Sequence, residues 1–226
     1  MPFTQDDIAR EHTVSQHSDD NNNSDDSAHQ EADRYQQRMA TKKRIVDERI
    51  ARADQERGVL IVLKGNGKGK SSSAFGTMAR AMGHGQRCAV IQFIKGRRAT
   101  GEYLFFNEHP QVDFHVMGHG FSWEVRDPER ERQAAQKAWA LAETLLGDPQ
   151  YHFLLFDELS YMIKYGYLDA ERIAQMLKAR PEHQNVMITG RTMAREIQDI
   201  ADTISVIHDE RHAFRLGVKA QAGIEY

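Results

Sequence analysis

Short apolar runs alternate with amphipathic stretches along most of the chain. The runs that we expect to form strands cover residues 59–63, 89–94, 112–117, 153–156, 186–189 and 203–207. Several of them are apolar without strict alternation, which is typical of strands covered on both faces. Helical patterns over residues 127–147, 169–179 and 194–201 separate the later strands. This order predicts an α/β fold in which a mostly parallel six-stranded sheet carries helices on both faces.

The first 33 residues follow neither pattern and are strongly acidic. Nine Asp or Glu residues stand there against one base, Arg10. A segment of this composition buries too little apolar surface to offset the entropy lost on ordering it. Residues 1–33 are therefore expected to form a disordered acidic tail.

Residues 34–57 change to a helical pattern. Their apolar positions at helical spacing are Tyr35, Met39, Val46, Ile50 and Ala53, with bases dominating the remaining positions. We expect an amphipathic N-terminal helix, which either packs on its own domain or a second subunit, or approaches an anionic ligand as a basic lid. Residues 58–226 are expected to form the α/β domain.

Composition and charge exclude several classes of protein. The chain has 226 residues, of which 40% are hydrophobic, so it can bury a core. The single cysteine, Cys88, excludes an internal disulfide and a multi-thiolate metal site, which fits a reducing cytoplasm. No apolar run approaches the roughly 20 residues of a membrane helix, and the basic segment lacks aromatic residues between its bases. We expect a cytoplasmic protein that binds neither membrane nor nucleic acid.

A glycine-rich segment follows the first expected strand. The candidates for phosphate contact in it are Gly65, Asn66, Gly67, Lys68, Gly69, Lys70, Ser71 and Ser72. In such a turn, backbone N–H groups converge on phosphate oxygens, Lys70 neutralises charge and the Ser71 hydroxyl can bind Mg²⁺. The segment departs from the standard motif, because Lys64 stands where the first glycine is usual. A tight strand-to-helix turn is the alternative, but the apolar strand before it and the small residues after it favour a P-loop nucleotide-binding fold.

Two acidic residues follow the fourth expected strand, and a basic residue follows the fifth. Asp157 and Glu158 follow the fourth strand, where a carboxylate can hold a metal beside a phosphate loop. Their side chains point in opposite directions in an extended backbone, so we expect only one of them to bind the metal. Capping of the next helix is the alternative. Arg191, after the fifth strand, either reaches the triphosphate or is an ordinary loop charge.

Between residues 34 and 226 the chain resembles the P-loop-type ATP:corrinoid adenosyltransferases of bacterial cobalamin synthesis and salvage. The segments that carry the resemblance are residues 65–71, 75–76, 80–85, 92–96, 117–124, 156–161, 179–181, 189–191 and 217–226. Ser71 stands where this family usually has threonine, which preserves the hydroxyl. His119 stands where a small polar residue is expected, either near the corrinoid or on a solvent-facing turn.

The resemblance implies transfer of the 5′-deoxyadenosyl group of ATP to the Co(I) centre of a corrinoid, with release of inorganic triphosphate. It implies Lys70 as the catalytic residue, and Ser71 with Glu158 as ligands of Mg²⁺, with Mn²⁺ as a substitute. Phe121 and Trp123 match the residues that form an apolar wall under the corrin, although aromatic residues often fill the core instead.

The same resemblance implies two protein partners. A reduced flavoprotein would supply the electrons that convert Co(II) to Co(I). A second copy of the chain would form a homodimer, with the helix over residues 34–57 covering an active site.

Two other functions use the same glycine-rich segment. An ATP or GTP hydrolase or kinase is one, although no water-positioning glutamine or kinase motif accompanies the loop. A nucleotide-sensing regulatory module, whose acidic tail contacts a partner, is the other. The reaction products distinguish all three functions.

Overall fold

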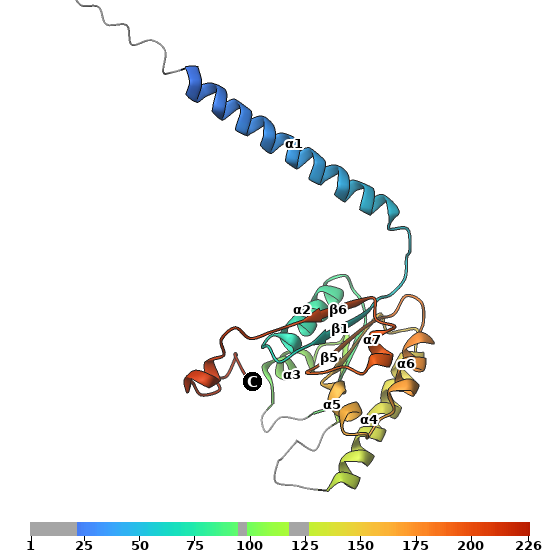
Figure 1. Ribbon diagram of the computed structural model, residues 1–226. Coiled ribbons are helices and arrows are strands. Elements are labelled where there is room, and N and C mark those ends of the chain that lie inside the picture. The colour runs from blue at the N-terminus through green and yellow to red at the C-terminus, as the bar shows by residue number, and fades with distance from the viewer. Residues whose placement is uncertain (1–21, 95–98, 118–126) are drawn as a thin grey trace, which may run out of the picture. The chain divides into compact units, whose positions relative to one another are not determined.

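The computed structural model describes residues 22–94, 99–117 and 127–226. The chain divides into two units, residues 1–55 and residues 56–226. In the first unit the structure describes the helix α1 (Asn22–Arg52), shown in Figure 1. This helix begins at Asn22, earlier than residue 34, where the sequence pattern placed its start. The segment is rich in Asp, Asn and Ser, residue types that favour the first turn of a helix.

The second unit is built on one sheet. Its strands are β1 (Leu60–Lys64), β2 (Cys88–Gln92), β3 (Val112–Val116), β4 (Phe153–Asp157), β5 (Asn185–Gly190) and β6 (Thr203–Val206). They lie in the order β3-β2-β4-β5-β1-β6, and every neighbouring pair is parallel. The six-stranded parallel sheet is therefore confirmed. Parallel strands place all their carboxyl ends at one edge, where ligands bind in open α/β sheets.

In the described part of the second unit, six helices lie between the strands and a short 3₁₀ helix follows the last strand. They are α2 (Lys70–Gly83), α3 (Gly101–Phe106), α4 (Pro128–Gly147), α5 (Leu159–Lys164), α6 (Ala170–Lys178), α7 (Arg195–Gln198) and the short 3₁₀ helix η1 (Ala213–Leu216). The start of α4 follows the sequence signal, because the Asp127 side chain accepts a hydrogen bond from the Arg130 N–H at 3.1 Å and Pro128 is the first helical residue. The helix α7 is shorter than predicted, ending at Gln198.

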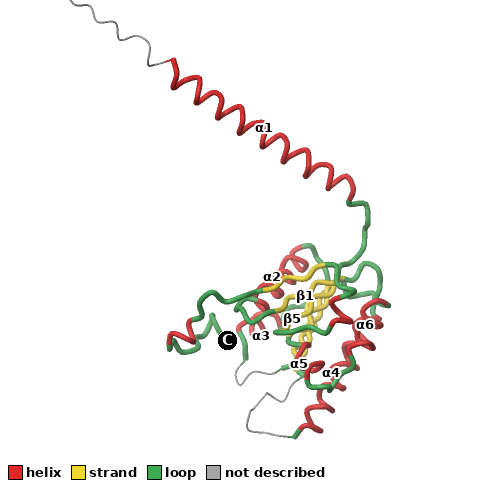
Figure 2. The backbone as a smooth tube through the Cα atoms, viewed as in Figure 1, coloured by secondary structure: helices red, strands yellow, loops and turns green. Residues whose placement is uncertain are grey.

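Helices cover both faces of the sheet, as predicted (Figure 2). Successive residues of β4 show how: Leu154 and Phe156 pack in the cluster with α4, α5, α6 and α7, whereas Phe153 and Leu155 pack in the cluster with α2 and α3. Cys88 is fully buried in the second cluster, and this burial raises the pKa of its thiol to about 12. The thiol is therefore a small apolar group rather than a nucleophile.

Among the described residues, we find no helix with the length and apolar composition that spanning a membrane requires.

A charged contact joins the amino ends of β1 and β6. The Asp202 carboxylate accepts hydrogen bonds from the Arg57 guanidinium at 2.6 Å and from the Leu60 N–H at 2.8 Å. The hydrogen bond from Arg57 is the main reason that the pKa of Asp202 lies below its usual value. An acid with a lowered pKa stabilises the fold above its unfolded-state pKa, and this contribution is lost as the pH falls through its folded-state pKa.

We predict that Asp202→Asn lowers the melting temperature at pH 7 by about 2–4 °C. The difference from wild type should begin to shrink below pH ~4, the unfolded-state pKa of an aspartate, and it should disappear as the pH falls through the lower folded-state pKa, where wild-type Asp202 is protonated as well. Asp199→Asn is the matched control, since the pair between Asp199 and Arg195 is solvent-exposed and should contribute little. Thermal unfolding at several pH values measures both effects, and a deficit independent of pH would contradict this account.

Candidate active site

A cavity of about 490 Å³ lies at the carboxyl ends of the strands. Five parts of the second unit line it: the glycine-rich loop with the start of α2, the ends of β2 and β4, the segment around α3, and the last residues of the chain. Of the predicted site residues, those that line it are Gly67, Lys68, Gly69, Lys70, Ser71, Ser72 and Glu158. The cavity therefore brings the loop and the acidic strand end together.

The other predicted site residues lie elsewhere. Asn66 and Arg191 line a second cavity of about 610 Å³, together with residues of the C-terminal segment. Gly65 is not among the lining residues of either cavity. Phe121 and Trp123 lie outside the described residues, as does His119.

Backbone N–H groups in the first half of the glycine-rich loop form hydrogen bonds with other parts of the chain. The Gly65 N–H donates to the Arg191 carbonyl at 3.0 Å, and the Gly67 N–H donates to the Ile207 carbonyl at 2.8 Å. The Lys68 N–H donates to the Asp209 carboxylate at 3.0 Å. The Gly67 and Lys68 amides therefore fix the loop against the segment that follows β6, and the Gly65 amide fixes it against the residue after β5. The amides at the start of α2 are the candidates for phosphate contact.

Close packing against Ile207 explains why glycine is needed at positions 65 and 67. A Cβ atom on Gly65 would lie 2.3 Å from the Ile207 carbonyl oxygen, and one on Gly67 would lie 2.7 Å from the same oxygen. Gly69, which caps α2, has open space around it but a φ of 116°, which side chains rarely adopt. The loop thus turns at Gly69 and directs the positive end of α2 at the cavity.

Lys70 is the first residue of α2 and is largely buried in the loop. Its Nζ donates to the Gly67 carbonyl oxygen at 2.7 Å. Burial lowers the pKa of this lysine, and the negative charge of Glu158 opposes that shift. A positive charge held in this position, next to free helix amides, attracts a polyanion.

The Asp157 carboxylate is buried and engaged by three donors. Its Oδ1 accepts from the hydroxyls of Ser71 at 2.9 Å and Thr189 at 2.7 Å, and its Oδ2 accepts from the Gln92 amide at 3.2 Å. Burial raises the pKa of Asp157, whereas each of these hydrogen bonds lowers it. Asp157 therefore acts as a shared acceptor for three elements.

Glu158 has different surroundings from its neighbour. It adopts a left-handed conformation with φ at 61°, at the residue before α5. Its Oε2 is buried, and no group in the described part of the chain forms a hydrogen bond with it. Burial and, next, the charge of Asp157 raise the pKa of Glu158 to about 7. Its free oxygen can therefore receive a proton or a cation.

The oxygen donors around the cavity suit a hard cation only in combination with a ligand. Within residues 22–94, 99–117 and 127–226, no group of three His, Cys, Asp or Glu side chains could hold a metal ion. Because the Ser71 hydroxyl donates its proton to Asp157, its lone pairs remain available. Ser71 and Glu158 thus fit a Mg²⁺ ion that takes its remaining ligands from phosphates and water.

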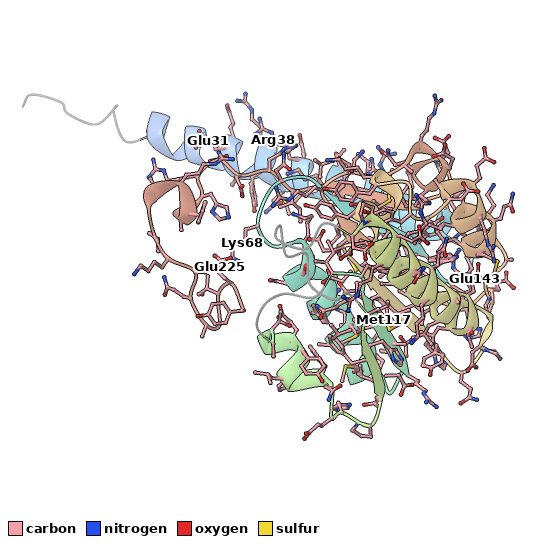
Figure 3. All side chains as sticks on the ribbon, turned by 90° about the horizontal axis from the view of Figure 1, so that it is seen from below. Glu31, Arg38, Lys68, Met117, Glu143 and Glu225 are labelled. Atoms are coloured by element: carbon pink, nitrogen blue, oxygen red, sulfur yellow. The ribbon has the colours of Figure 1, made fainter. Side chains whose placement is uncertain are left out.

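Three contributions to this region were missed from the sequence. Gln92 and Thr189 are polar residues that end or nearly end apolar strands, and this position was a usable signal. The C-terminal residues Gly223, Ile224, Glu225 and Tyr226 also line the cavity. Figure 3 shows Glu225 beside Lys68, and their ion pair measures 3.0 Å.

Arg191 acts on the same region from the end of β5. Burial raises the pKa of Tyr161, and the charge and hydrogen bond of Arg191 oppose this shift. The same positive charge lowers the pKa of Glu158, after the larger effects of burial, Asp157 and Lys70. Arg191 therefore adds to the positive potential around the loop.

Comparison with known proteins points to one family. Residues 56–226 match the family model described as ATP:corrinoid adenosyltransferase BtuR/CobO/CobP. A corrinoid adenosyltransferase of Pseudomonas aeruginosa is 48% identical over 194 residues, covering 85% of this chain and 96% of the relative. Corrinoid adenosyltransferase CobA of Salmonella typhimurium is also 48% identical over 194 residues, covering 86% and 98%. A corrinoid adenosyltransferase of Sinorhizobium sp is 37% identical over 196 residues, covering 85% and 92%.

We predict that Gly67→Ala weakens binding of Mg²⁺-ATP by about tenfold or more, ~1.4 kcal/mol, because the new Cβ displaces the loop from Ile207. Gly147→Ala is the matched control. Gly147 ends α4, and an added Cβ meets nothing within 4 Å. Calorimetric titration with Mg²⁺-ATP, with thermal unfolding of each variant, measures both properties. Equal affinities for the two variants would show that the loop does not depend on this close approach.

Proposed function

The chain belongs to the ATP:corrinoid adenosyltransferase family, and we propose that it transfers the 5′-deoxyadenosyl group of ATP to the Co(I) centre of a corrinoid. The products are an adenosylcorrinoid and inorganic triphosphate, in cobalamin synthesis or salvage. One observation carries the proposal: the family match includes the whole cavity in which the glycine-rich loop faces the acidic end of β4.

The chemistry of this reaction asks little of the protein beyond alignment and charge. Co(I) supplies the electron pair for the new bond to the ribose 5′-carbon, and the bond from that carbon to the triphosphate oxygen breaks. The electron pair of the broken bond leaves on triphosphate, so no protein nucleophile or general base is required. The protein must hold ATP with its 5′-carbon open to attack and stabilise the departing anion.

Lys70 and the first amides of α2 are the groups that we assign to the triphosphate. The buried Nζ of Lys70 already contacts a loop carbonyl, 2.7 Å away, so it is held in place before ATP binds. A preformed positive site needs little reorganisation when negative charge develops on the leaving group. Arg191 adds positive charge from the end of β5.

We infer that Ser71 and Glu158 bind Mg²⁺, or Mn²⁺ in its place. The unpartnered Oε2 of Glu158 and the available lone pairs of Ser71 support this assignment. When bound, the cation neutralises part of the triphosphate charge. Asp157 is assigned to hold Ser71 in place, since hydrogen bonds already engage both of its oxygens.

The corrinoid side of the proposal depends on Phe121 and Trp123. We infer that their rings form an apolar wall under the corrin, which excludes water from the lower face of cobalt. Loss of the lower axial ligand makes Co(II) easier to reduce, and we assign the reduction to a reduced flavoprotein. The family resemblance of residues 117–124 supports this role.

We also infer a cytoplasmic homodimer in which α1 covers an active site. The apolar positions Tyr35, Met39, Val46 and Ile50 recur at helical spacing along α1, which supports packing of this helix against a protein surface. The basic residues between them suit the neighbourhood of an anionic substrate.

A product assay tests the proposed function. The full chain is incubated with ATP, Mg²⁺ and a chemically reduced Co(I) corrinoid, while the Co(I) absorbance and the phosphate products are followed. We expect one triphosphate for each adenosylcorrinoid. Orthophosphate or a phosphorylated acceptor would indicate a hydrolase or kinase, and ATP binding without turnover would indicate a sensing module.

We predict that Lys70→Ala lowers the rate of adenosylation by about 100-fold or more while the protein stays folded, because it removes charge stabilisation of the leaving triphosphate. Lys178→Ala is the matched control, since this exposed lysine in the last turn of α6 is not a cavity residue. Initial rates at saturating Co(I) corrinoid, with circular dichroism of both variants, measure the effect. Full activity of Lys70→Ala would exclude the phosphate site.

We predict that the double variant Phe121→Ala, Trp123→Ala is impaired about tenfold more with Co(II) corrinoid and a flavoprotein reductant than with Co(I) supplied already reduced. The reason is that an open lower face favours the five-coordinate state. Electron paramagnetic resonance of bound Co(II), with Mg²⁺-ATP present, reports the coordination directly. Equal impairment in both assays, or loss of ATP binding, would show that the two rings have another role.

A further inference from the structure

Thr189 contacts both acidic residues at the end of β4. It lies in β5, next to that strand, and is fully buried. Its hydroxyl donates to the Asp157 Oδ1 at 2.7 Å and accepts from the Glu158 N–H at 3.0 Å. In the described part of the chain, the other two donors to Asp157, Ser71 and Gln92, form no hydrogen bond with Glu158. One hydroxyl thus connects the two carboxylate residues.

The bond to Glu158 matters because that residue has a strained backbone. Among the described residues, Glu158 is the one non-glycine residue with positive φ. Such a conformation is unfavourable for a residue with a side chain and persists where neighbouring groups hold it. The Thr189 hydroxyl binds the N–H of this same residue, so it stabilises the turn where the strain occurs.

The next residue of β5 restricts the same turn. A Cβ atom on Gly190 would lie 2.0 Å from the Ser160 Oγ, so β5 and the start of α5 are in close contact. With Thr189 bonded on one side and Gly190 in contact on the other, the backbone around Glu158 has little room to change. The direction of the Glu158 side chain follows from this restriction.

We propose that Thr189 is a positioning residue for the cation site. Its hydroxyl keeps Asp157 in place as the acceptor for Ser71, and it keeps Glu158 turned so that the free Oε2 is available to the cation. Thr189 itself contacts neither substrate nor cation. This inference rests on the proposed function in one respect, since it assumes that Ser71 and Glu158 hold the cation of Mg²⁺-ATP.

Three variants test the proposal in the full-length protein. Thr189→Val removes the hydroxyl at nearly constant shape, and Thr189→Ser keeps it. Ile188→Val, at the adjacent buried position of β5, is the control for a general loss of core packing. Electron paramagnetic resonance of free Mn²⁺, titrated with each protein in the presence of ATP, reports cation affinity without any need for turnover.

We expect Thr189→Val to weaken Mn²⁺ binding by about tenfold or more, while Thr189→Ser and Ile188→Val stay within about twofold of wild type. The Mg²⁺ concentration for half-maximal adenosylation should shift in the same order. Wild-type Mn²⁺ affinity in Thr189→Val would overturn the proposal, as would a tenfold loss in Ile188→Val or in Thr189→Ser.

A further variant covers the case in which Thr189→Val does not fold. Thr189→Cys keeps the side-chain size but offers a weaker donor and acceptor, so we expect an intermediate loss of Mn²⁺ affinity. Wild-type affinity in this variant would overturn the proposal in the same way. If wild type binds Mn²⁺-ATP but forms no adenosylcorrinoid, the proposed function fails while the variants still decide the role of Thr189.

Discussion

The buried carboxylate of Asp157 is the interaction on which the site depends. A buried carboxylate is costly unless hydrogen bonds compensate for lost water, and here three donors do so from the start of α2, from β2 and from β5. These donors come from parts of the chain that meet only when the sheet is formed. The hydrogen bonds that offset the cost of burying Asp157 therefore also set the position of α2 relative to the end of β4.

Two adjacent acids consequently have different surroundings. Both oxygens of Asp157 accept hydrogen bonds, whereas the Oε2 of Glu158 is buried and has no hydrogen-bond partner in the described part of the chain. The turn that separates them brings Glu158 into a left-handed conformation, which the Thr189 hydroxyl and the tight packing at Gly190 support. The glycine-rich loop has a separate support, because the Gly67 N–H donates to the Ile207 carbonyl in the segment after β6. The start of α2, which we assign to phosphate, is thus held both through Ser71 and through the glycine-rich loop, which limits the reorganisation needed on binding.

Local sequence signals predicted much of this arrangement. The apolar runs indicated the parallel strands, the Asp127-Pro128 pair indicated the start of α4, and the glycine-rich segment indicated the loop. The start of α1 was missed because composition argued for disorder while Asp and Asn residues also suit a helix N-terminus. The internal bonds of Gly65 and Gly67 could not be read locally, because their partners lie far along the chain. The placement of Thr189 beside both acids likewise depends on which strand lies next to β4.

The most direct test is anomalous diffraction from a crystal of the protein with Mn²⁺ and ATP. The account predicts a manganese peak bonded to the Ser71 hydroxyl and the Glu158 carboxylate, with Asp157 still accepting hydrogen bonds from Ser71 and Thr189. A peak bonded directly to Asp157, with Glu158 turned away from the nucleotide, would contradict it.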